Sequence, residues 1–189
     1  MEKGKIIFLN GVSSAGKTTL TKVLQSKLTM PYYHICCDDF MNMSPKHALQ
    51  NDFDKQLSIT QCIMHETISL FSDRGHNVIV DDVVLNLPDK NDWLYDYATM
   101  FQNYPILFVR VDCTIEELEL REIKRGDRSI GQSRWQLEHM DFDVTYDLVV
   151  NTYKNTTEEC ADKIISILDT PDKWFAVKAI KRDIENRRI

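Results

Sequence analysis

The stretch that most limits how this chain can fold is IIFLNGVSSAGKTT, residues 6–19. Four apolar residues lead into Asn10, and the next eight residues, 11–18, fit the pattern G-x-x-x-x-G-K-[ST]. This pattern, the P-loop, indicates a phosphate-binding turn when it follows a strand and opens a helix. The apolar run predicts that strand, and Leu20, Leu24 and Leu28 mark one face of the predicted helix.

The residue types of a P-loop follow from how it binds phosphate. Backbone N–H groups must curl around an oxyanion, and glycine permits both the turn and the close approach. The helix that follows directs its positive end at the bound phosphates. We expect Lys17 to reach the β- and γ-phosphates and act in catalysis, and the Thr18 hydroxyl to hold Mg²⁺. The predicted nucleotide-binding residues are Gly11, Val12, Ser13, Ser14, Ala15, Gly16, Lys17, Thr18 and Thr19.

Apolar runs predict five strands, which alternate with amphipathic helices. The strands are expected at 6–9, 32–37, 77–80, 106–111 and 148–150. Strands that consist of nearly continuous apolar runs are typical of a parallel sheet covered on both faces. The predicted fold class is therefore α/β, with three layers (αβα) around a mostly parallel five-stranded sheet. We expect one domain in residues 1–170, with a C-terminal helix at 171–189 as part of it.

Two further segments have local predictions. A helix from about residue 56 to 73 is expected to be apolar at Ile59, Ile63, Thr67 and Leu70. The polar, methionine-rich segment 40–45 is expected to be irregular.

Charge and cysteine usage exclude several classes of protein. The net charge of −6 argues against a surface for nucleic acid or for an anionic membrane, and no apolar run approaches the length of a membrane span. The five cysteines form no C-x-x-C pair and are odd in number, which favours the reducing cytoplasm. We therefore expect a cytoplasmic protein whose partner is a small molecule. A homodimer stays open, because the final helix could pack within the chain or across a dimer.

Two pairs of aspartates directly follow predicted strands, Asp38–Asp39 and Asp81–Asp82. Ligands of a parallel α/β sheet bind outside the carboxyl ends of its strands, where these pairs meet the P-loop. We assign Asp38 as the general base, with Asp39 as the alternative if the register differs by one residue. We assign Asp81 to orient Mg²⁺ through water, with Asp82 as its rival. The ordinary alternatives are a cap for the next segment and a solvated strand end.

The motifs favour a phosphotransferase among nucleotide-binding proteins. The chain has neither the D-x-x-G nor the N-K-x-D motif of G proteins. Between Thr19 and Asp73 there is no arginine to bind a phosphorylated acceptor, whereas several aspartates stand among apolar residues. Carboxylates near the γ-phosphate suit an alcohol that must lose a proton. The expected acceptor is therefore a hydroxyl group of a small, neutral or cationic, partly apolar molecule.

Two alternatives to this function stay open. The first is a kinase of a larger acceptor, such as a sugar nucleotide or an RNA end. The second is a non-catalytic nucleotide-binding protein, which would bind the nucleotide without transferring phosphate.

A charged helix near the middle of the chain carries a candidate lid, in the segment 121–140. Arg121 and Arg125 lie on one helical face, and Arg128 follows just after Gly126. A lid could close on the triphosphate and neutralise charge on the transferring group. Cations at a helix C-terminus also complement its dipole, which is the simpler explanation for these arginines.

The chain resembles the chloramphenicol phosphotransferase-like branch of the small P-loop kinases. The likeness spans about residues 5–168. It depends on IIFLNGVSSAGKTTL, on Asp38 with Pro45 downstream, and on the stretches VIVDDV, REIKRGDR, YDLVVNT and EECADKI. Gly131, Gln136 and His139 follow the lid segment at similar spacings.

The resemblance implies a P-loop kinase domain with the activity of its family. ATP would be the donor, Mg²⁺ its metal ion, and a hydroxyl of a small molecule the acceptor. Asp38 would occupy the position of the catalytic aspartate. Arg125 and Arg128 would belong to the lid and bind the nucleotide, with Arg128 also acting on the transferring group.

Overall fold

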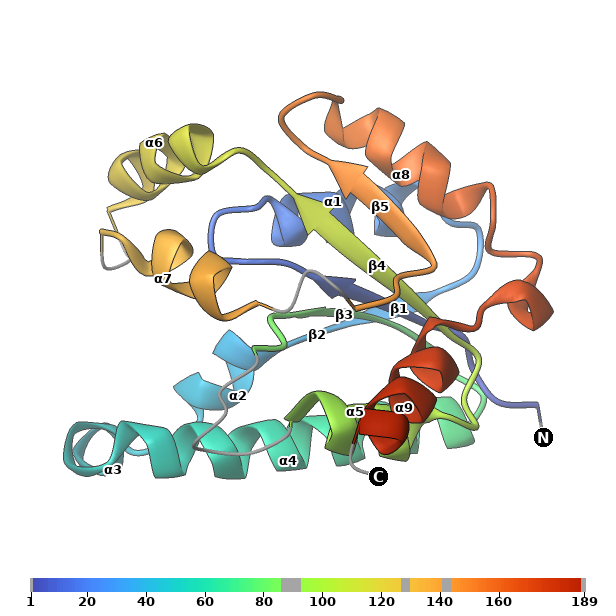
Figure 1. Ribbon diagram of the computed structural model, residues 1–189, viewed down its shortest axis with the longest axis horizontal. Coiled ribbons are helices and arrows are strands. Elements are labelled where there is room, and N and C mark those ends of the chain that lie inside the picture. Colours follow the sequence, from blue (N-terminus) through green and yellow to red (C-terminus); the bar gives the residue numbers. More distant parts are fainter. Residues whose placement is uncertain (1, 86–92, 127–129, 141–143, 188–189) are drawn as a thin grey trace.

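A five-stranded sheet forms the centre of the molecule (Figure 1). The computed structural model describes residues 2–85, 93–126, 130–140 and 144–187. The strands are β1 (Ile6–Asn10), β2 (Tyr32–Cys36), β3 (Asn77–Asp82), β4 (Ile106–Asp112) and β5 (Leu148–Asn151). Neighbouring strands pair in parallel, in the order β2-β3-β1-β4-β5. The predicted α/β fold class, with a parallel five-stranded sheet between two helical layers, is confirmed.

Helices connect the strands, because a parallel pair needs a long crossover connection. Their bounds are α1 (Lys17–Lys27), α2 (Cys37–Asn42), α3 (Lys46–Asn51), α4 (Phe53–Asp73), α5 (Trp93–Phe101), α6 (Ile115–Arg125), α7 (Gln132–His139), α8 (Thr157–Ile165) and α9 (Ala176–Arg187). A short 3₁₀ helix, Pro171–Lys173, precedes α9.

Strand β1 is buried along its whole length, and its alternate residues face two different layers of helices. Ile7 and Leu9 belong to one core with residues of α1 and α8. Ile6 and Phe8 belong to the other core, with residues of α4, α5 and α9. Successive side chains of a strand point to opposite faces of the sheet, so a single apolar run supplies both cores. The P-loop therefore follows the most completely covered part of the sheet.

Helix α4 buries a different face from the one that its apolar spacing indicates. Ile59, Ile63 and Leu70 are 43%, 49% and 55% exposed. The buried residues of α4 are Thr60, Gln61, Met64, Ile68 and Ser72. The expected apolar face is wrong because a second set of residues at helical spacing also offers large apolar side chains, and those contact the sheet. Met64 and Ile68 are fully buried there.

Of the segment 40–45, for which the sequence predicts irregular structure, residues 40–42 are helical and residues 43–45 lie between α2 and α3 outside any helix. Strand β2 ends at Cys36, and α2 begins at Cys37 and runs to Asn42. Asp38 and Asp39 lie in its first turn, where carboxylates complement the positive end of a helix. Asp38 is therefore carried by the first turn of a short helix and not by the strand itself.

Helix α9 packs against α5 and β4 within the same chain. Its residues Val177 and Ile180 are buried in the core that also holds Phe8. Among the helices of the described residues, none combines the length and the apolar character that a membrane crossing requires.

Candidate active site

A large cleft lies outside the carboxyl ends of the strands. Figure 1 shows the helices beside this end of the sheet, with α6 and α7 on one side and α2 and α4 on the other. The volume of the cleft is about 1110 Å³. A pocket for one small molecule usually measures about 300–1,000 Å³, so this cleft exceeds the usual size. The predicted site residues that line it are Ser13, Ser14, Gly16, Lys17, Thr18, Thr19, Asp38, Asp81 and Arg125. The other predicted residues of the P-loop, Gly11, Val12 and Ala15, are buried and do not line the cleft.

The P-loop needs glycine at two positions for different reasons. A Cβ atom at Gly11 would lie 2.7 Å from the carbonyl oxygen of Val111, so β4 approaches too closely for a side chain. Gly16 has a φ of 92°, which is the left-handed conformation that glycine adopts without strain. Helix α1 has a glycine, Gly16, as its N-cap residue, so it has no cap from the side chain of that residue. Its first N–H groups are therefore available to an anion in the cleft.

Asp81, in β3, connects the P-loop to the neighbouring strands. Its Oδ2 accepts a hydrogen bond from Thr18 Oγ1 at 2.6 Å, and its Oδ1 lies 3.6 Å from Lys17 Nζ. His34 Nε2, in β2, lies 3.7 Å from Oδ2. Burial by itself would raise the pKa of Asp81, but the contacts with His34, Lys17 and Thr18 outweigh it and lower the pKa to about 2. Asp81 is therefore ionised beside the Thr18 hydroxyl.

Asp82 lines the same cleft but has a different environment. Asp82 is only 5% exposed. Burial raises the pKa of Asp82 to about 7, helped by the charges of Asp81 and Asp38 and opposed by the Val83 N–H and by Lys17. Because the Thr18 hydroxyl contacts Asp81 and not Asp82, the two adjacent carboxylates have separate surroundings.

Asp38 and Asp39 are both exposed, and they differ in what their side chains lie against. Of the two, Asp38 lines the cleft with the P-loop. Asp39 lies against Cys36, where burial first and the Asp39 carboxylate in addition raise the pKa of the thiol to about 12. The side chain at position 38 thus shares the cleft with Lys17.

The candidate lid contributes through α6 and α7. Arg125 lines the cleft from the end of α6, whereas Arg128 lies outside the described residues. Arg121 donates hydrogen bonds to the Ser14 carbonyl oxygen at 3.3 Å and to Thr152 Oγ1 at 3.1 Å. Arg121 therefore connects α6 to both the P-loop and the end of β5.

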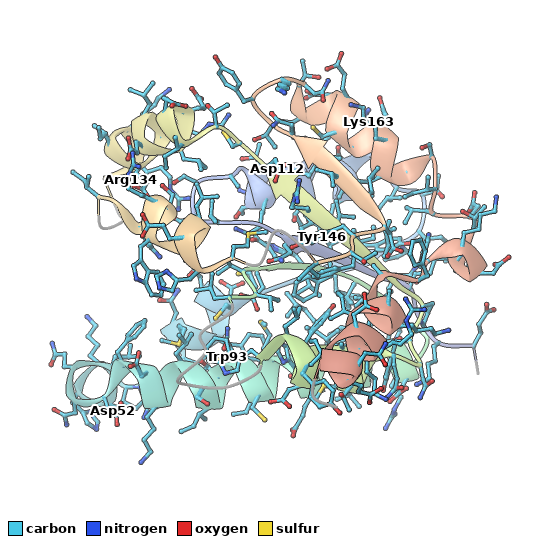
Figure 2. All side chains as sticks on the ribbon, in the orientation of Figure 1. Asp52, Trp93, Asp112, Arg134, Tyr146 and Lys163 are labelled. Carbon is cyan, nitrogen blue, oxygen red and sulfur yellow. The ribbon has the colours of Figure 1, made fainter. Side chains whose placement is uncertain are left out.

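The two ends of the cleft differ in charge. The cationic side chains beside the P-loop and α6 are Lys17, Arg121, Lys124 and Arg125. The end formed by α2, α4 and the start of α5 carries Asp38 and Asp54, with Lys55 beside them. Its apolar wall consists of Met41, Phe53, Leu57, Leu85 and Trp93, the last of which is labelled in Figure 2.

Comparison with known proteins assigns the family. Residues 4–169 match the family described as chloramphenicol phosphotransferase-like protein. The chain belongs to this family. Proteins of two Mycobacterium tuberculosis strains, provisionally named O-phosphotransferases, are 30% identical over 188 residues, which cover 87% of this chain and 82% of theirs. The resemblance found in the sequence is thereby confirmed.

This chloramphenicol phosphotransferase-like protein is also similar to two kinases from outside the set of O-phosphotransferases. An adenylyl-sulfate kinase of Clostridium acetobutylicum is 28% identical over 179 residues, covering 88% of this chain and 84% of its own. The structure of the Mycobacterium tuberculosis APS kinase CysC with AMPPNP and APS has a TM-score of 0.67 at 17% identity, covering 90% of this chain and 100% of that chain. At that identity the likeness shows a common fold. The family, the relatives and the fold together make this protein a phosphotransferase of the P-loop type.

Sequence reasoning missed several contacts of this family member's P-loop. Thr152, after β5, donates from Oγ1 to the Ala15 carbonyl oxygen at 2.8 Å. Gln136 of α7 accepts a hydrogen bond from the Ser13 N–H at 2.6 Å. The only signal for Gln136 in the sequence is its spacing from the lid segment, which gives no information about the P-loop contact.

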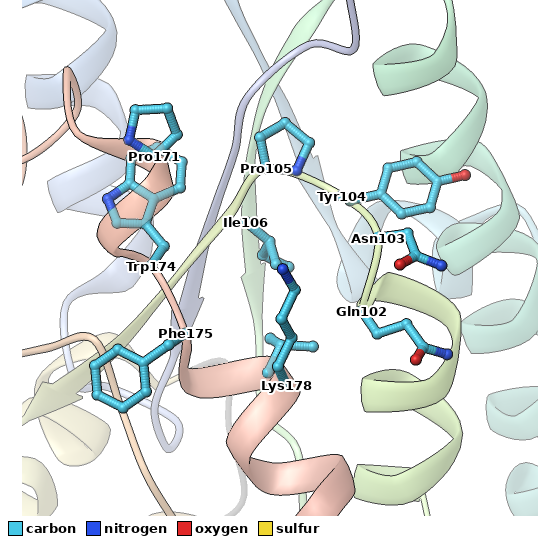
Figure 3. Close-up of a pocket in the computed structure, with 10 residues that line it drawn as sticks. Gln102, Asn103, Tyr104, Pro105, Ile106, Pro171, Trp174, Phe175 and Lys178 are labelled. Carbon is cyan, nitrogen blue, oxygen red and sulfur yellow. The ribbon is translucent and has the colours of Figure 1, made fainter.

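A separate, smaller cavity lies at the other end of the strands, near the residue where β4 begins (Figure 3). Its volume is about 310 Å³, and residues 102–106 and 171–178 contribute its lining. The predicted site residues that the structure describes all lie at the carboxyl ends of the strands, where the P-loop is, so this cavity is no part of the candidate active site.

Proposed function

We propose that this protein transfers the γ-phosphoryl group of ATP to a hydroxyl group of a small molecule without negative charge. The observation that most supports this proposal is one cleft that is lined by the P-loop, by Lys17 and by the carboxylate of Asp38. The first turn of α2 favours an acid at position 38 in any protein, but a nucleotide-binding protein without catalysis gives no reason for that acid to line the cleft. An alcohol acceptor does, because it must lose a proton as it is phosphorylated.

The donor would lie along the P-loop. The uncapped N–H groups of α1 would hold its phosphates, and Lys17, close to both Val12 O and Asp81, would turn to the β- and γ-phosphate oxygens. Arg125 and, by family resemblance, Arg128 would neutralise charge on the transferring group. These cations come from the P-loop and the lid, so they would enclose the triphosphate from two sides.

The transfer step would be an in-line displacement. The acceptor oxygen forms a bond to the γ-phosphorus while the bond from that phosphorus to the β–γ bridging oxygen breaks, and ADP leaves with the electron pair. Asp38 accepts the hydroxyl proton of the acceptor. Holding the acceptor and the triphosphate in one cleft supplies the alignment that this displacement needs.

Thr18 and Asp81 fit the Mg²⁺ ion that such a reaction uses. Mg²⁺ prefers oxygen ligands and is usually bound by one or two protein groups together with substrate phosphates. The Thr18 hydroxyl and the ionised Asp81 carboxylate are in direct contact, so both can face one ion or its water. Thr18 and Asp81 would hold the ion, which would supply positive charge against the phosphates of the donor.

The acceptor end of the cleft supports a neutral or cationic, partly apolar alcohol. Asp38 and Asp54 would repel an anion, and Phe53 and Trp93 offer aromatic surface. A second candidate is an anionic acceptor, which the adenylyl-sulfate kinase relative and the presence of Lys55 in the cleft favour. The charge of the molecule that is phosphorylated therefore distinguishes the two candidate functions.

A transfer assay would test the proposal. ATP consumption is measured with the full chain and Mg²⁺ against chloramphenicol, aminoglycosides and adenylyl sulfate, and the phosphorylated product is identified by mass spectrometry. Phosphorylation of an uncharged or cationic alcohol supports the proposal. Turnover of adenylyl sulfate alone would favour the second candidate, and nucleotide binding without any turnover would favour a non-catalytic role.

The neighbouring aspartates provide a matched pair of variants for the base. Asp38→Ala should lower the transfer rate by about a hundred-fold or more while the affinity for AMP-PNP stays nearly unchanged. Asp39→Ala changes the same residue type one position along α2, beside Cys36, and should keep most of the rate. Equal losses in the two variants would remove Asp38 from the mechanism.

A further inference from the structure

The P-loop contains one residue in an unusual backbone conformation. Ser14 has a φ of 62°, the left-handed region, and it is the single non-glycine residue of the described chain with a positive φ. A residue with a Cβ atom is strained in this region and keeps the conformation only when its surroundings enforce it. Something beyond the P-loop sequence must therefore hold Ser14 in place.

Two side chains of the lid hold the backbone on both sides of Ser14. Gln136 Oε1 accepts a hydrogen bond from the Ser13 N–H at 2.6 Å. Arg121 donates to the Ser14 carbonyl oxygen at 3.3 Å. Because a backbone N–H can only donate, the amide of Gln136 must present its oxygen to the loop. Gln136 is 8% exposed, so water has little access to replace it.

Gln136 acts from a helix that is itself fixed to α6. Glu122 of α6 is fully buried, and its two carboxylate oxygens accept hydrogen bonds from the Gly131 N–H at 3.0 Å and the Ser133 N–H at 2.6 Å. These N–H groups belong to the start of α7, which begins after a glycine and has no cap from its own N-cap residue. A carboxylate from the neighbouring helix supplies the cap and sets where α7 begins.

We propose that Gln136 is a positioning residue for the P-loop. Its amide oxygen holds the Ser13 N–H, and with Arg121 it keeps Ser14 in the left-handed conformation in which the loop receives the donor phosphates. Glu122 fixes the start of α7, and therefore the position of the helix that carries Gln136 to the loop. This role depends on the proposed function only in that the donor is a nucleoside triphosphate. The same contact joins the lid to the phosphate-binding turn.

Hydrogen exchange of the nucleotide-free protein tests the contact. In Gln136→Ala, the amide of Ser13 loses its acceptor, and peptides that contain it should exchange about ten-fold faster than in the wild type. Gln136→Glu keeps an acceptor oxygen at the same distance and should exchange as the wild type does. Gln132→Ala, one turn earlier on the same helix, is the matched control and should leave P-loop exchange unchanged. Equal exchange in Gln136→Ala and the wild type, or faster exchange in Gln136→Glu, overturns the assignment.

A double variant separates positioning through the backbone from direct contact with the ligand. With Mg²⁺ and AMP-PNP in calorimetry, Gln136→Ala should bind about ten-fold more weakly than the wild type. Ser14→Gly removes the strain, since glycine adopts a positive φ freely. In that background the same Gln136→Ala change should weaken binding by less than about three-fold.

Calorimetry and hydrogen exchange distinguish a failure of the positioning role from a failure of the proposed function. A ten-fold loss in both backgrounds would mean that Gln136 touches the nucleotide itself, which overturns the positioning role. If the wild type does not bind AMP-PNP at all, the proposed function fails, while amide exchange still decides whether Gln136 holds the P-loop.

Discussion

Helix α4 carries a histidine in apolar surroundings. The ring of His65 meets the rings of Tyr97 and Phe101 edge-on, with centroids 5.7 Å and 6.0 Å apart. Its Nε2 atom is buried without a hydrogen-bond partner among the described residues. Burial lowers the pKa of His65 to about 4. A charged imidazole there would lose its hydration without gaining a partner.

This pKa fixes the direction and size of a pH effect on stability. An unfolded histidine has a pKa of about 6.5, so between that value and pH 4 the unfolded chain binds a proton that the folded chain does not. The contribution of His65 to the free energy of unfolding is complete above about pH 6.5 and is lost as the pH falls. The full loss is about 3 kcal/mol, and about 2 kcal/mol is already lost at pH 5.

Urea unfolding at pH 8, 6 and 5 would measure this loss in the wild type and in His65→Leu. Leucine occupies a similar volume and does not titrate, so the variant should lose about 2 kcal/mol less than the wild type between pH 8 and pH 5. His47→Leu, at an exposed position of α3, controls for the removal of a histidine in general. Parallel pH profiles for the wild type and His65→Leu would refute the argument that burial keeps this imidazole neutral.

Three further changes test the site and its supports. Gly11→Ala should destabilise the fold by about 1–3 kcal/mol in urea, because its Cβ would lie 2.7 Å from Val111 O; an unchanged midpoint would contradict this close approach. Glu122→Leu should cost about 2–4 kcal/mol, since two N–H groups of α7 lose their acceptor, and thermal unfolding with hydrogen exchange of α7 measures the effect. Lys17→Ala should weaken AMP-PNP binding about ten- to a hundred-fold in calorimetry and also lower the transfer rate, and wild-type affinity would exclude Lys17 from the phosphate site.

The fold, and the cleft that is the candidate site, could be predicted because most of their signals in the sequence are local or periodic. Glycine at 16 is needed by the backbone of the turn itself, which has a positive φ there. Glycine at 11 belongs to the same sequence pattern, although the structure shows that its reason is the close approach of Val111 in β4. The apolar run of β1 predicts a strand covered on both faces, and both cores form on it. The rule that ligands bind at the carboxyl ends of parallel strands brought Asp38 and Asp81 to one cleft with the P-loop.

The choice between neighbouring residues needed the tertiary structure. Asp81 and Asp82 are the same residue type in one strand, and only the hydroxyl of Thr18, from another element, distinguishes them. Asp38 and Asp39 differ because α2 begins at Cys37, which turns one side chain to the cleft and leaves the other beside Cys36. Adjacent positions are chemically equal in a sequence, so partners that lie far away in the chain decide their roles.

The sequence by itself determined that this protein has a parallel α/β sheet with a P-loop, because the apolar run of a strand, the glycine of a turn and the apolar spacing of a helix are each contained within a few residues. Only the tertiary structure decided which side chains support that turn. Arg121 and Gln136 reach the Ser13–Ser14 backbone from more than a hundred residues away, across 107 and 123 positions of sequence. Contacts of that kind have no local pattern, since their geometry exists only after the helices have packed.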